Sequence, residues 1–574
     1  MFEASRVLDP SFPRDDLDYL WQGIVDNHYT DESAYLGSLL AISEPSGRER
    51  QAIADRATGL IRKVREQDDS VHMVDALLQE YSLDTEEGIL LMCLAEALIR
   101  IPDAHTADEL IRDKMGDADW SRHLGRSESV MVNASTWGML LTGRVVRMDP
   151  GLDGHPKSIW HKLVNRCGEP VIRKAMYQAM AIMGRQFVLG RDINEALQEG
   201  RQYRDQGYTY SFDMLGEAAL NDSDSSRYFN DYWSAIEAVG NDRYPRGEQP
   251  IPSVSIKLSA LHPRYERAQQ DRVHKELTTR LLKLVRFARE KGVPLTVDAE
   301  EMDRLELSLE VFRTVYESDA CRGWGEFGLA VQAYSKPALP VLCWIAALAR
   351  KQGDRIPVRL VKGAYWDTEI KHAQVLGVDT YPVYTRKEGT DVCYLACARF
   401  LLSDYAQGHI FPQFASHNAH TVASILNMAE ENGAEYEFQR LHGMGDALYA
   451  VVMQEVPRVP VRIYAPVGAH KDLLPYLVRR LLENGANSSF VHRLVDAETP
   501  IEDLVGHPAD ALRQHNHFPD LRIPRPPGIY GSERRNSRGH NLAVLSELKP
   551  FMEGLGQWAS HEWRGTPIVN GERC

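Results

Sequence analysis

The sequence predicts an α/β protein built on a (βα)8 barrel, the TIM-barrel fold. From about residue 208 onward, short segments rich in β-branched and aromatic residues alternate with segments of helical periodicity. Eight such units over about 270 residues fit a closed parallel barrel. A doubly wound open sheet is the alternative, but no GxGxxG pattern follows any strand. The predicted strands are 208–217, 253–261, 294–300, 327–334, 357–365, 414–418, 436–443 and 461–468.

The chain before the barrel reads as helices. Leu17, Leu20, Trp21, Ile24 and Val25 follow the spacing of one helix face. No phosphate-binding loop, metal cluster or basic stripe interrupts this region, which we therefore interpret as scaffold. The predicted organisation is a helical arm at 1–50, a helical scaffold domain at 51–205, the barrel at 206–495, and a linker with the start of a further domain at 496–574.

Composition narrows the class of protein. The net charge of −15, from 66 basic and 81 acidic residues in a chain of 574, argues against general binding of nucleic acid. The seven cysteines form no CxxC pair, which is typical of a reducing cytoplasm. The N-terminus lacks the pattern of a signal peptide, and no apolar run reaches the roughly 20 residues of a membrane-spanning helix. We therefore expect a cytoplasmic protein whose membrane contact, if any, is peripheral.

Polar residues follow almost every predicted strand. Barrel enzymes carry their reactive groups at the C-terminal ends of the strands, so these residues predict a functional barrel mouth. Cations and hydrogen-bond donors outnumber carboxylates in this set. Its members are Asp213, Glu217, Lys257, Asp298, Glu300, Gln332, Tyr334, Arg359, Lys362, His417, Asn418, His442 and Tyr464.

A metal-dependent hydrolase on the same barrel is the alternative function. His417 and His420 form an HxxH pattern that Asp298 and Glu300 could complete. Hydrolase barrels usually pair histidines two residues apart on one strand, and this chain has no HxH. We also expect His420 to lie inside the helix that follows the strand. The sequence therefore favours a site without metal.

The run RLVKGAYW at 359–366 fits a large, planar, anionic cofactor. Gly363 and Ala364 remove side-chain bulk where the backbone would approach the cofactor closely. Arg359 and Lys362 supply positive charge, and either Tyr365 or Trp366 supplies an aromatic wall.

The segment DLLPYLVRRLLENGAN at 472–487 is the second strong cluster. Tyr476, Arg479 and Glu483 share one face of a helix, and Arg480 lies about 100° further round. The flanking positions are mostly leucine, so an arginine pair here needs an anionic partner. Two guanidinium groups can hold a carboxylate from two sides.

At these residues the chain resembles the proline dehydrogenases, and in particular the proline dehydrogenase part of proline utilization A. The resemblance covers essentially the whole chain and stops before the aldehyde dehydrogenase domain that completes proline utilization A. The matching motifs are RKAMYQAMAIMGRQFVLG (173–190), DMLGEAAL (213–220), SIKLSAL (255–261), DAEE (298–301), RLVKGAYW (359–366), SHNAH (416–420), LHGMG (441–445), YAPVG (464–468) and YLVRRLLENGANSSFV (476–491).

The resemblance implies an FAD enzyme on a TIM barrel whose last helix, 472–485, packs over the barrel mouth. By position, Asp298 and Arg359 would be catalytic, with Arg359 at the flavin N5 edge. The substrate carboxylate and ring would meet Lys257, Tyr464, Tyr476, Arg479 and Arg480. FAD would contact Gln332, Arg359, Val361, Lys362, Gly363, Ala364, Trp366, Thr385, Lys387, Ser416, His417 and Glu483.

The implied reaction is oxidation of L-proline to Δ1-pyrroline-5-carboxylate, with hydride passing from proline C5 to flavin N5 and electrons passing on to a quinone. The last residues resemble the approach to an aldehyde dehydrogenase domain, yet no catalytic cysteine loop follows, so we expect no NAD-dependent activity. No ribbon-helix-helix precedes Phe2, and with the acidic net charge this predicts no binding to DNA. The sequence does not determine the oligomeric state.

Overall fold

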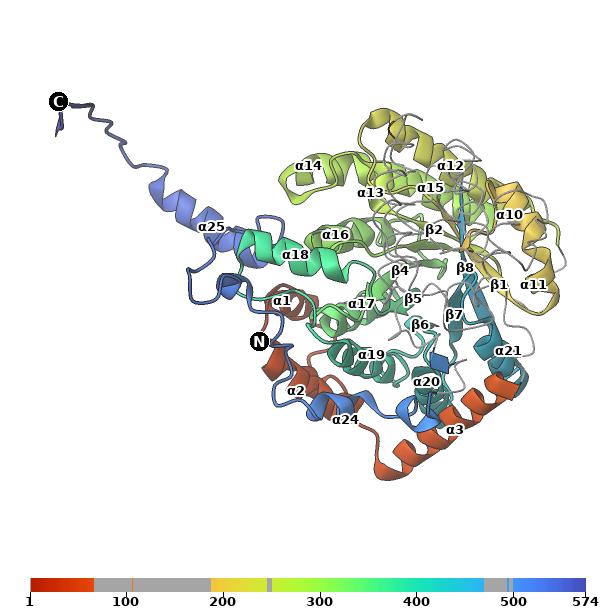
Figure 1. The fold of residues 1–574 in the computed structure, drawn as a ribbon. Helices are drawn as coiled ribbons and strands as arrows, with labels where there is room; N and C mark the ends of the chain where they lie inside the picture. Colours follow the sequence, from red (N-terminus) through yellow and green to blue (C-terminus); the bar gives the residue numbers. More distant parts are fainter. Residues whose placement is uncertain are drawn as a thin grey trace, which may run out of the picture.

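The computed structural model describes residues 2–66, 106, 187–244, 250–468, 493–494 and 499–573. Its centre is a closed barrel of eight parallel strands in sequence order, β1 to β8, with β8 paired back to β1 (Figure 1). The strands are β1 Thr209–Met214, β2 Ser253–Ile256, β3 Leu295–Val297, β4 Phe327–Gln332, β5 Ile356–Val361, β6 Ile410–Ala415, β7 Glu437–Leu441 and β8 Val461–Val467. The predicted fold class is confirmed.

All eight predicted strands are present, but several of their predicted bounds were wrong, most clearly those of the second and sixth strands. The second strand ends at Ile256, and α13 (Leu258–Leu261) occupies the rest of the predicted segment. The sixth strand begins at Ile410, before the predicted start at residue 414. Pro412 lies within it and disguises the strand in the sequence, because proline lacks the N–H that a sheet ladder needs.

Helices follow the strands and form an outer ring around the barrel (Figure 1). His420 lies inside α20, as the sequence predicts. The predicted helix at 472–485 lies outside the described residues. The helices of the barrel region are α10 Ile193–Glu199, α11 Arg201–Asp205, α12 Asp222–Asn241, α14 Gln270–Arg272, α15 Thr278–Lys291, α16 Leu305–Tyr316, α17 Ala338–Gln352, α18 Trp366–Leu376, α19 Lys387–Leu401, α20 Ala419–Asn432 and α21 Asp446–Glu455.

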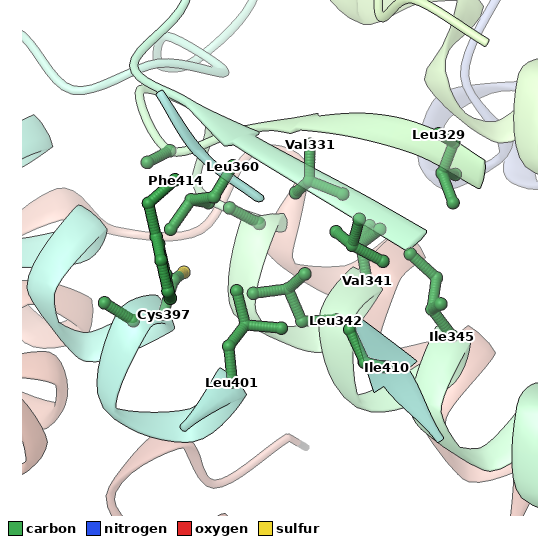
Figure 2. Packing of buried hydrophobic residues seen from close by; sticks show 14 of the residues in the cluster. Leu329, Val331, Val341, Leu342, Ile345, Leu360, Cys397, Leu401, Ile410 and Phe414 are labelled. Carbon is green, nitrogen blue, oxygen red and sulfur yellow. The ribbon is translucent and has the colours of Figure 1, made fainter. Parts of the chain in front are cut away.

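The apolar core lies between the strands and this ring of helices. Figure 2 shows one part of it, where β4, β5 and β6 meet α17 and α19. Burying each such side chain stabilises the fold by roughly 1.5–3 kcal/mol. This packing leaves the inward face of the strands for polar residues. The labelled side chains are Leu329, Val331, Val341, Leu342, Ile345, Leu360, Cys397, Leu401, Ile410 and Phe414, all at most 4% exposed.

The N-terminal residues pack on one side of the barrel as three helices (Figure 1). These are α1 Leu17–Asn27, α2 Glu32–Ser43 and α3 Gly47–Glu66. The α1 helix begins after Asp16, whose side chain accepts hydrogen bonds from two N–H groups of the first turn. The α3 helix runs across residue 50, where the predicted arm ends, and Arg56 pairs with Glu430 of α20 at 2.6 Å.

The last described segment, 499–573, crosses the outside of the barrel and then leaves it. It contains α24 (Pro508–Arg513), α25 (Leu545–Trp558) and a short hairpin of β9 (Ile568–Val569) with β10 (Glu572–Arg573). Asn541 donates to Asp303 at 2.7 Å and the Tyr381 hydroxyl donates to the carbonyl of Pro524 at 2.7 Å, so the segment is attached near α18. Helix α25 extends away from the barrel and buries no residue (Figure 1).

Candidate active site

The inner face of the barrel is polar because alternate residues of several strands carry polar side chains. Residues two apart on a strand share a face. On β2 and just after it this places Ser253, Ser255 and Lys257 together, and on β7 it places Glu437 and Gln439 together. All are buried. The site is therefore part of the barrel interior, not an addition from its loops.

Arg359 lies at the centre of this interior and is 3% exposed. Its Nη1 donates to Asp298 Oδ1 at 2.6 Å, and its Nε donates to the side-chain oxygen of Gln439 at 2.6 Å. Its Nη2 donates to the hydroxyls of Ser211 and Ser255, each at 3.0 Å. Four strands or strand ends thus hold one guanidinium group, which fixes its plane.

Lys257, Asp298 and Tyr464 form a second set of contacts beside Arg359. The Tyr464 hydroxyl donates to Asp298 Oδ2 at 2.7 Å, and Lys257 Nζ lies 3.4 Å from the same oxygen. Lys257 Nζ also donates to Asp213 Oδ1 at 2.6 Å. Asp298 therefore joins three predicted site residues, and the structure brings all four together.

The charges of this cluster support one another. Burial alone would lower the pKa of the Lys257 ammonium, but the negative charge of Asp213 and further neighbours outweigh burial and raise that pKa well above its ordinary value. Burial, reinforced by Asp213 and Asp298, raises the pKa of the Tyr464 phenol well above its ordinary value. At neutral pH the site therefore holds a charged lysine and a neutral tyrosine whose hydroxyl donates a hydrogen bond to Asp298.

The run from Val361 to Trp366 leaves the end of β5 as an open turn. Gly363 has φ +139°, and a Cβ at this position would lie 2.4 Å from the ring of Tyr334. Glycine is therefore required here, both for the backbone conformation and for the close approach of Tyr334. Gly363 and Ala364 are exposed, and the indole N–H of Trp366 donates to the carbonyl of Tyr384 at 2.8 Å.

Lys362 and Lys387 meet at a single carboxylate. Asp391 accepts from Lys387 Nζ at 3.1 Å and also pairs with Lys362. Burial would raise the pKa of Asp391, but the two ammonium groups outweigh burial and lower that pKa. Two cations and one anion leave a net positive charge beside the open turn, which suits an anionic group.

The remaining predicted cofactor contacts lie around the mouth with partners of their own. Gln332 donates to the carbonyl of Glu300 at 2.8 Å. His417 Nε2 accepts the N–H of Leu441 at 3.1 Å, so that nitrogen carries no proton. The Ser416 hydroxyl accepts from the N–H of Asn418 at 3.2 Å.

Thr385 is held from outside the barrel. Its hydroxyl donates to the carboxylate of Glu32 on α2 at 3.0 Å and accepts from the N–H of Asp520 at 2.8 Å. Its role as a phosphate contact stays a prediction, and the carboxylate already bonded to its hydroxyl weighs against that role, because it would repel a phosphate.

Four predicted site residues, Tyr476, Arg479, Arg480 and Glu483, lie outside the described residues. The structure adds four residues that were not predicted as site residues: Ser211, Ser255, Gln439 and Asp391. The first three were recognisable as polar residues at alternate positions of otherwise apolar strands. Asp391 lies four residues after Lys387 on α19, a spacing that could have indicated this pair, whereas its second partner, Lys362, comes from another element.

The residues of the open turn fit a planar, anionic cofactor such as FAD. At Gly363, where a side chain would clash with Tyr334, the backbone is exposed to an approaching cofactor. The net positive charge of Lys362, Lys387 and Asp391 would offset the charge of a pyrophosphate group. Within the described residues, no three histidine, cysteine, aspartate or glutamate side chains lie close enough together to hold a metal ion. In the same part of the chain, no helix is both long and apolar enough to cross a membrane.

This fold and site define a barrel protein with a buried cluster of alternating charges at its mouth. Comparison with known families gives the family. The family model described as "Proline dehydrogenase" matches residues 196–493, and the chain belongs to the proline dehydrogenase family. A second model, described as "DNA-binding domain of Proline dehydrogenase", matches residues 73–187.

Relatives agree with this membership. The "Bifunctional protein PutA" of Salmonella typhimurium is 44% identical over 99% of this chain, which spans 43% of that protein. "Proline dehydrogenase 1" of Bacillus subtilis is 26% identical over 54% of this chain and 88% of its own length. A crystal structure of Bradyrhizobium japonicum Proline Utilization A has a TM-score of 0.72 and 44% identity, covering 92% of this chain and 53% of that one. The chain therefore spans about half the length of these longer relatives.

Proposed function

We propose that the protein oxidises L-proline to Δ1-pyrroline-5-carboxylate with FAD as the primary acceptor. The observation that carries the proposal is the buried cluster of Lys257, Asp298, Arg359 and Tyr464, which lies at the C-terminal ends of barrel strands in a member of the proline dehydrogenase family. Reactions of barrel enzymes take place at this end of the fold.

The reaction removes two electrons and two protons from proline, because C5 loses a hydride and the ring nitrogen loses its proton. Bound FAD would supply the hydride acceptor. The protein's own task is to bind and orient the substrate. The Lys257 ammonium would attract the proline carboxylate, and Tyr464 would pack against the proline ring.

Arg359 and Asp298 control charge around the reacting atoms. The positive charge of Arg359 favours an electron-rich partner beside it, and Asp298 balances that charge through the 2.6 Å contact. Asp298 already accepts from Tyr464 and Arg359 and lies near Lys257, so it acts through its charge. Val361, Gly363 and Trp366 of the open turn would line the cofactor.

We further propose that a quinone reoxidises the flavin and that the protein works in the cytoplasm or peripherally on the inner face of the membrane. The family resemblance supports the proposed quinone and the proposed location.

We propose that the protein has no nucleic-acid partner. The acidic net charge supports this absence, whereas the description of the family model matched at 73–187 points toward DNA binding. Retardation of duplex DNA at physiological salt would contradict our proposal.

The test of the activity is optical. The purified protein should be yellow, and anaerobic L-proline should bleach its flavin absorption, whereas D-proline should not. With wild-type protein, L-proline should also reduce a water-soluble quinone analogue. A colourless protein carrying stoichiometric zinc would support the metal-hydrolase alternative and refute the proposal.

Variants separate substrate binding from cofactor binding. Arg479→Met or Arg480→Met should raise KM for proline at least about tenfold and leave the protein yellow, because truncating one partner of a buried charge pair costs about 2–5 kcal/mol. Arg355→Met, at a half-exposed position on the barrel, is the matched control and should leave KM unchanged. Loss of FAD with unchanged KM would show that the two arginines hold the cofactor instead.

A further inference from the structure

We infer that Gln439 is a positioning residue for Arg359, held in one orientation by the buried pair of Glu437 and Arg462. The inference rests on the proposed function, in which Arg359 lies beside the flavin. None of these three residues belongs to the predicted substrate or cofactor contacts. They lie deeper in the barrel, on β7 and β8, and each is at most 4% exposed.

The three residues form a continuous chain of hydrogen bonds that ends at Arg359. Arg462 Nε donates to Glu437 Oε1 at 2.7 Å. The same carboxylate oxygen accepts the amide nitrogen of Gln439 at 2.8 Å. The amide oxygen of Gln439 then accepts from Arg359 Nε at 2.6 Å. The chain joins the buried pair of Glu437 and Arg462 to the guanidinium group of Arg359.

The chemistry of its neighbours determines which way the Gln439 amide points. A guanidinium group can only donate, so Arg359 requires the amide oxygen. Glu437 acts as an acceptor toward Arg462 and Gln439 alike, so it requires the amide nitrogen. A flipped amide would place donor against donor and acceptor against acceptor in a buried site, where each unsatisfied group costs about 1–3 kcal/mol.

Gln439 contributes what the other partners of Arg359 do not. Asp298 and the two serines contact the terminal nitrogens, whereas Gln439 contacts Nε, where the planar group joins its flexible stem. Contacts at both ends of the guanidinium prevent it from rotating within the site. Without Gln439, Arg359 would keep its charge but lose one of the contacts that fix its plane.

Gln413 on β6 provides a matched control. Its amide nitrogen donates to the same Glu437 oxygen at the same distance, 2.8 Å, and it is likewise buried. Its side-chain oxygen has no hydrogen-bond partner among the described residues, so it gives Arg359 no support. A role of Gln439 in barrel packing alone would make the two glutamines equivalent.

The experiment compares Gln439→Leu with Gln413→Leu in the flavin-loaded protein. Gln439→Leu should lower kcat by about tenfold or more with KM for proline within about twofold, since the lost bond is one to a charged group. It should also move the flavin midpoint potential to a more negative value, because a less fixed cation stabilises the reduced flavin less. Gln413→Leu should leave both quantities close to wild type.

A second variant keeps the test decisive if Gln439→Leu does not fold. Gln439→Glu should retain kcat at low pH, where the new carboxyl carries a proton and reproduces the amide's donor and acceptor. It should lose kcat as pH rises and two carboxylates face each other. Wild type and Gln413→Leu should lack this ionisation.

The outcomes separate this inference from the proposed function. Equal potentials and equal kcat in Gln439→Leu and Gln413→Leu would overturn the positioning role, as would an unchanged pH profile in Gln439→Glu. A wild-type protein that binds no FAD, measured by fluorescence titration, or that proline does not bleach, would refute the proposed function first.

Discussion

Replacing Arg359 with methionine should destabilise the protein strongly, because the guanidinium neutralises a buried carboxylate. Arg359 is 3% exposed and Asp298 is 9% exposed. Breaking such a pair costs about 3–5 kcal/mol, and the lower value applies here because Lys257 and Tyr464 still contact Asp298. The orphaned amide oxygen of Gln439 adds about 1 kcal/mol. We expect a loss of about 4 kcal/mol in total.

The matched control is Arg355→Met, at the N-terminal side of the same strand. Its side chain is 40% exposed and lies 4.0 Å from Glu435, which is 88% exposed. A surface pair of this kind contributes less than about 1 kcal/mol. Both variants change the same side chain to the same replacement, so the difference between them reports burial and pairing.

Urea unfolding at neutral pH, followed by tryptophan fluorescence and circular dichroism, measures both losses. Coincident transitions and similar m-values are needed for the comparison of free energies. If Arg359→Met lies within about 1 kcal/mol of Arg355→Met, the argument that this cation neutralises a buried carboxylate is wrong.

Further predictions concern pH and the open turn. Burial raises the pKa of Glu369 to about 7 from 4.5, so between these pH values the folded state holds a proton that the unfolded chain releases. The stability that comes from the protonated carboxyl is therefore fully present below pH 4.5 and is lost as the pH rises from 4.5 through about 7. Glu369→Gln should therefore raise Tm at pH 8 and leave it unchanged at pH 4; an equal gain at both would contradict this reasoning. Burial lowers the pKa of His420 to about 3 from 6.5. The stability that comes from keeping this imidazole neutral is therefore fully present above pH 6.5 and is lost as the pH falls from 6.5 toward 3. His420→Leu should flatten the acid side of the Tm profile, and an unchanged slope would exclude His420 as its source. Gly363→Ala should cost at least about 2 kcal/mol and lower the ratio of flavin to protein absorbance, since its Cβ would lie 2.4 Å from Tyr334. Gly59→Ala, in a helix with open space at its Cβ, should be neutral or stabilising, and equal losses in the two alanine variants would contradict the steric argument.

The positions of the strands could be predicted almost completely, and the errors in their predicted bounds have local causes. Alternation and β-branched residues marked all eight strands, since each must bury an outer face against a helix. Pro412 concealed the start of β6 because proline is rare in central strands. The end of β2 was overestimated because Leu258, Ala260 and Leu261 are apolar and suit a strand or a buried helical turn equally.

The sequence alone determined the order of the elements, the polar strand ends and the family resemblance. It therefore placed Lys257, Asp298, Arg359 and Tyr464 in one site, because parallel strands of a barrel end at the same face. Only the tertiary structure decided which groups meet. Asp298 is shared by three partners and Gln439 supports Arg359 because of the stagger between distant strands. Periodicity along one strand carries no information about that stagger. Asp391 meets Lys387 one helical turn away on α19, but its second partner, Lys362, follows β5 and is brought to it only by the fold. Such hydrogen-bond partners are decided by distances in space, whereas the sequence records only distances along the chain.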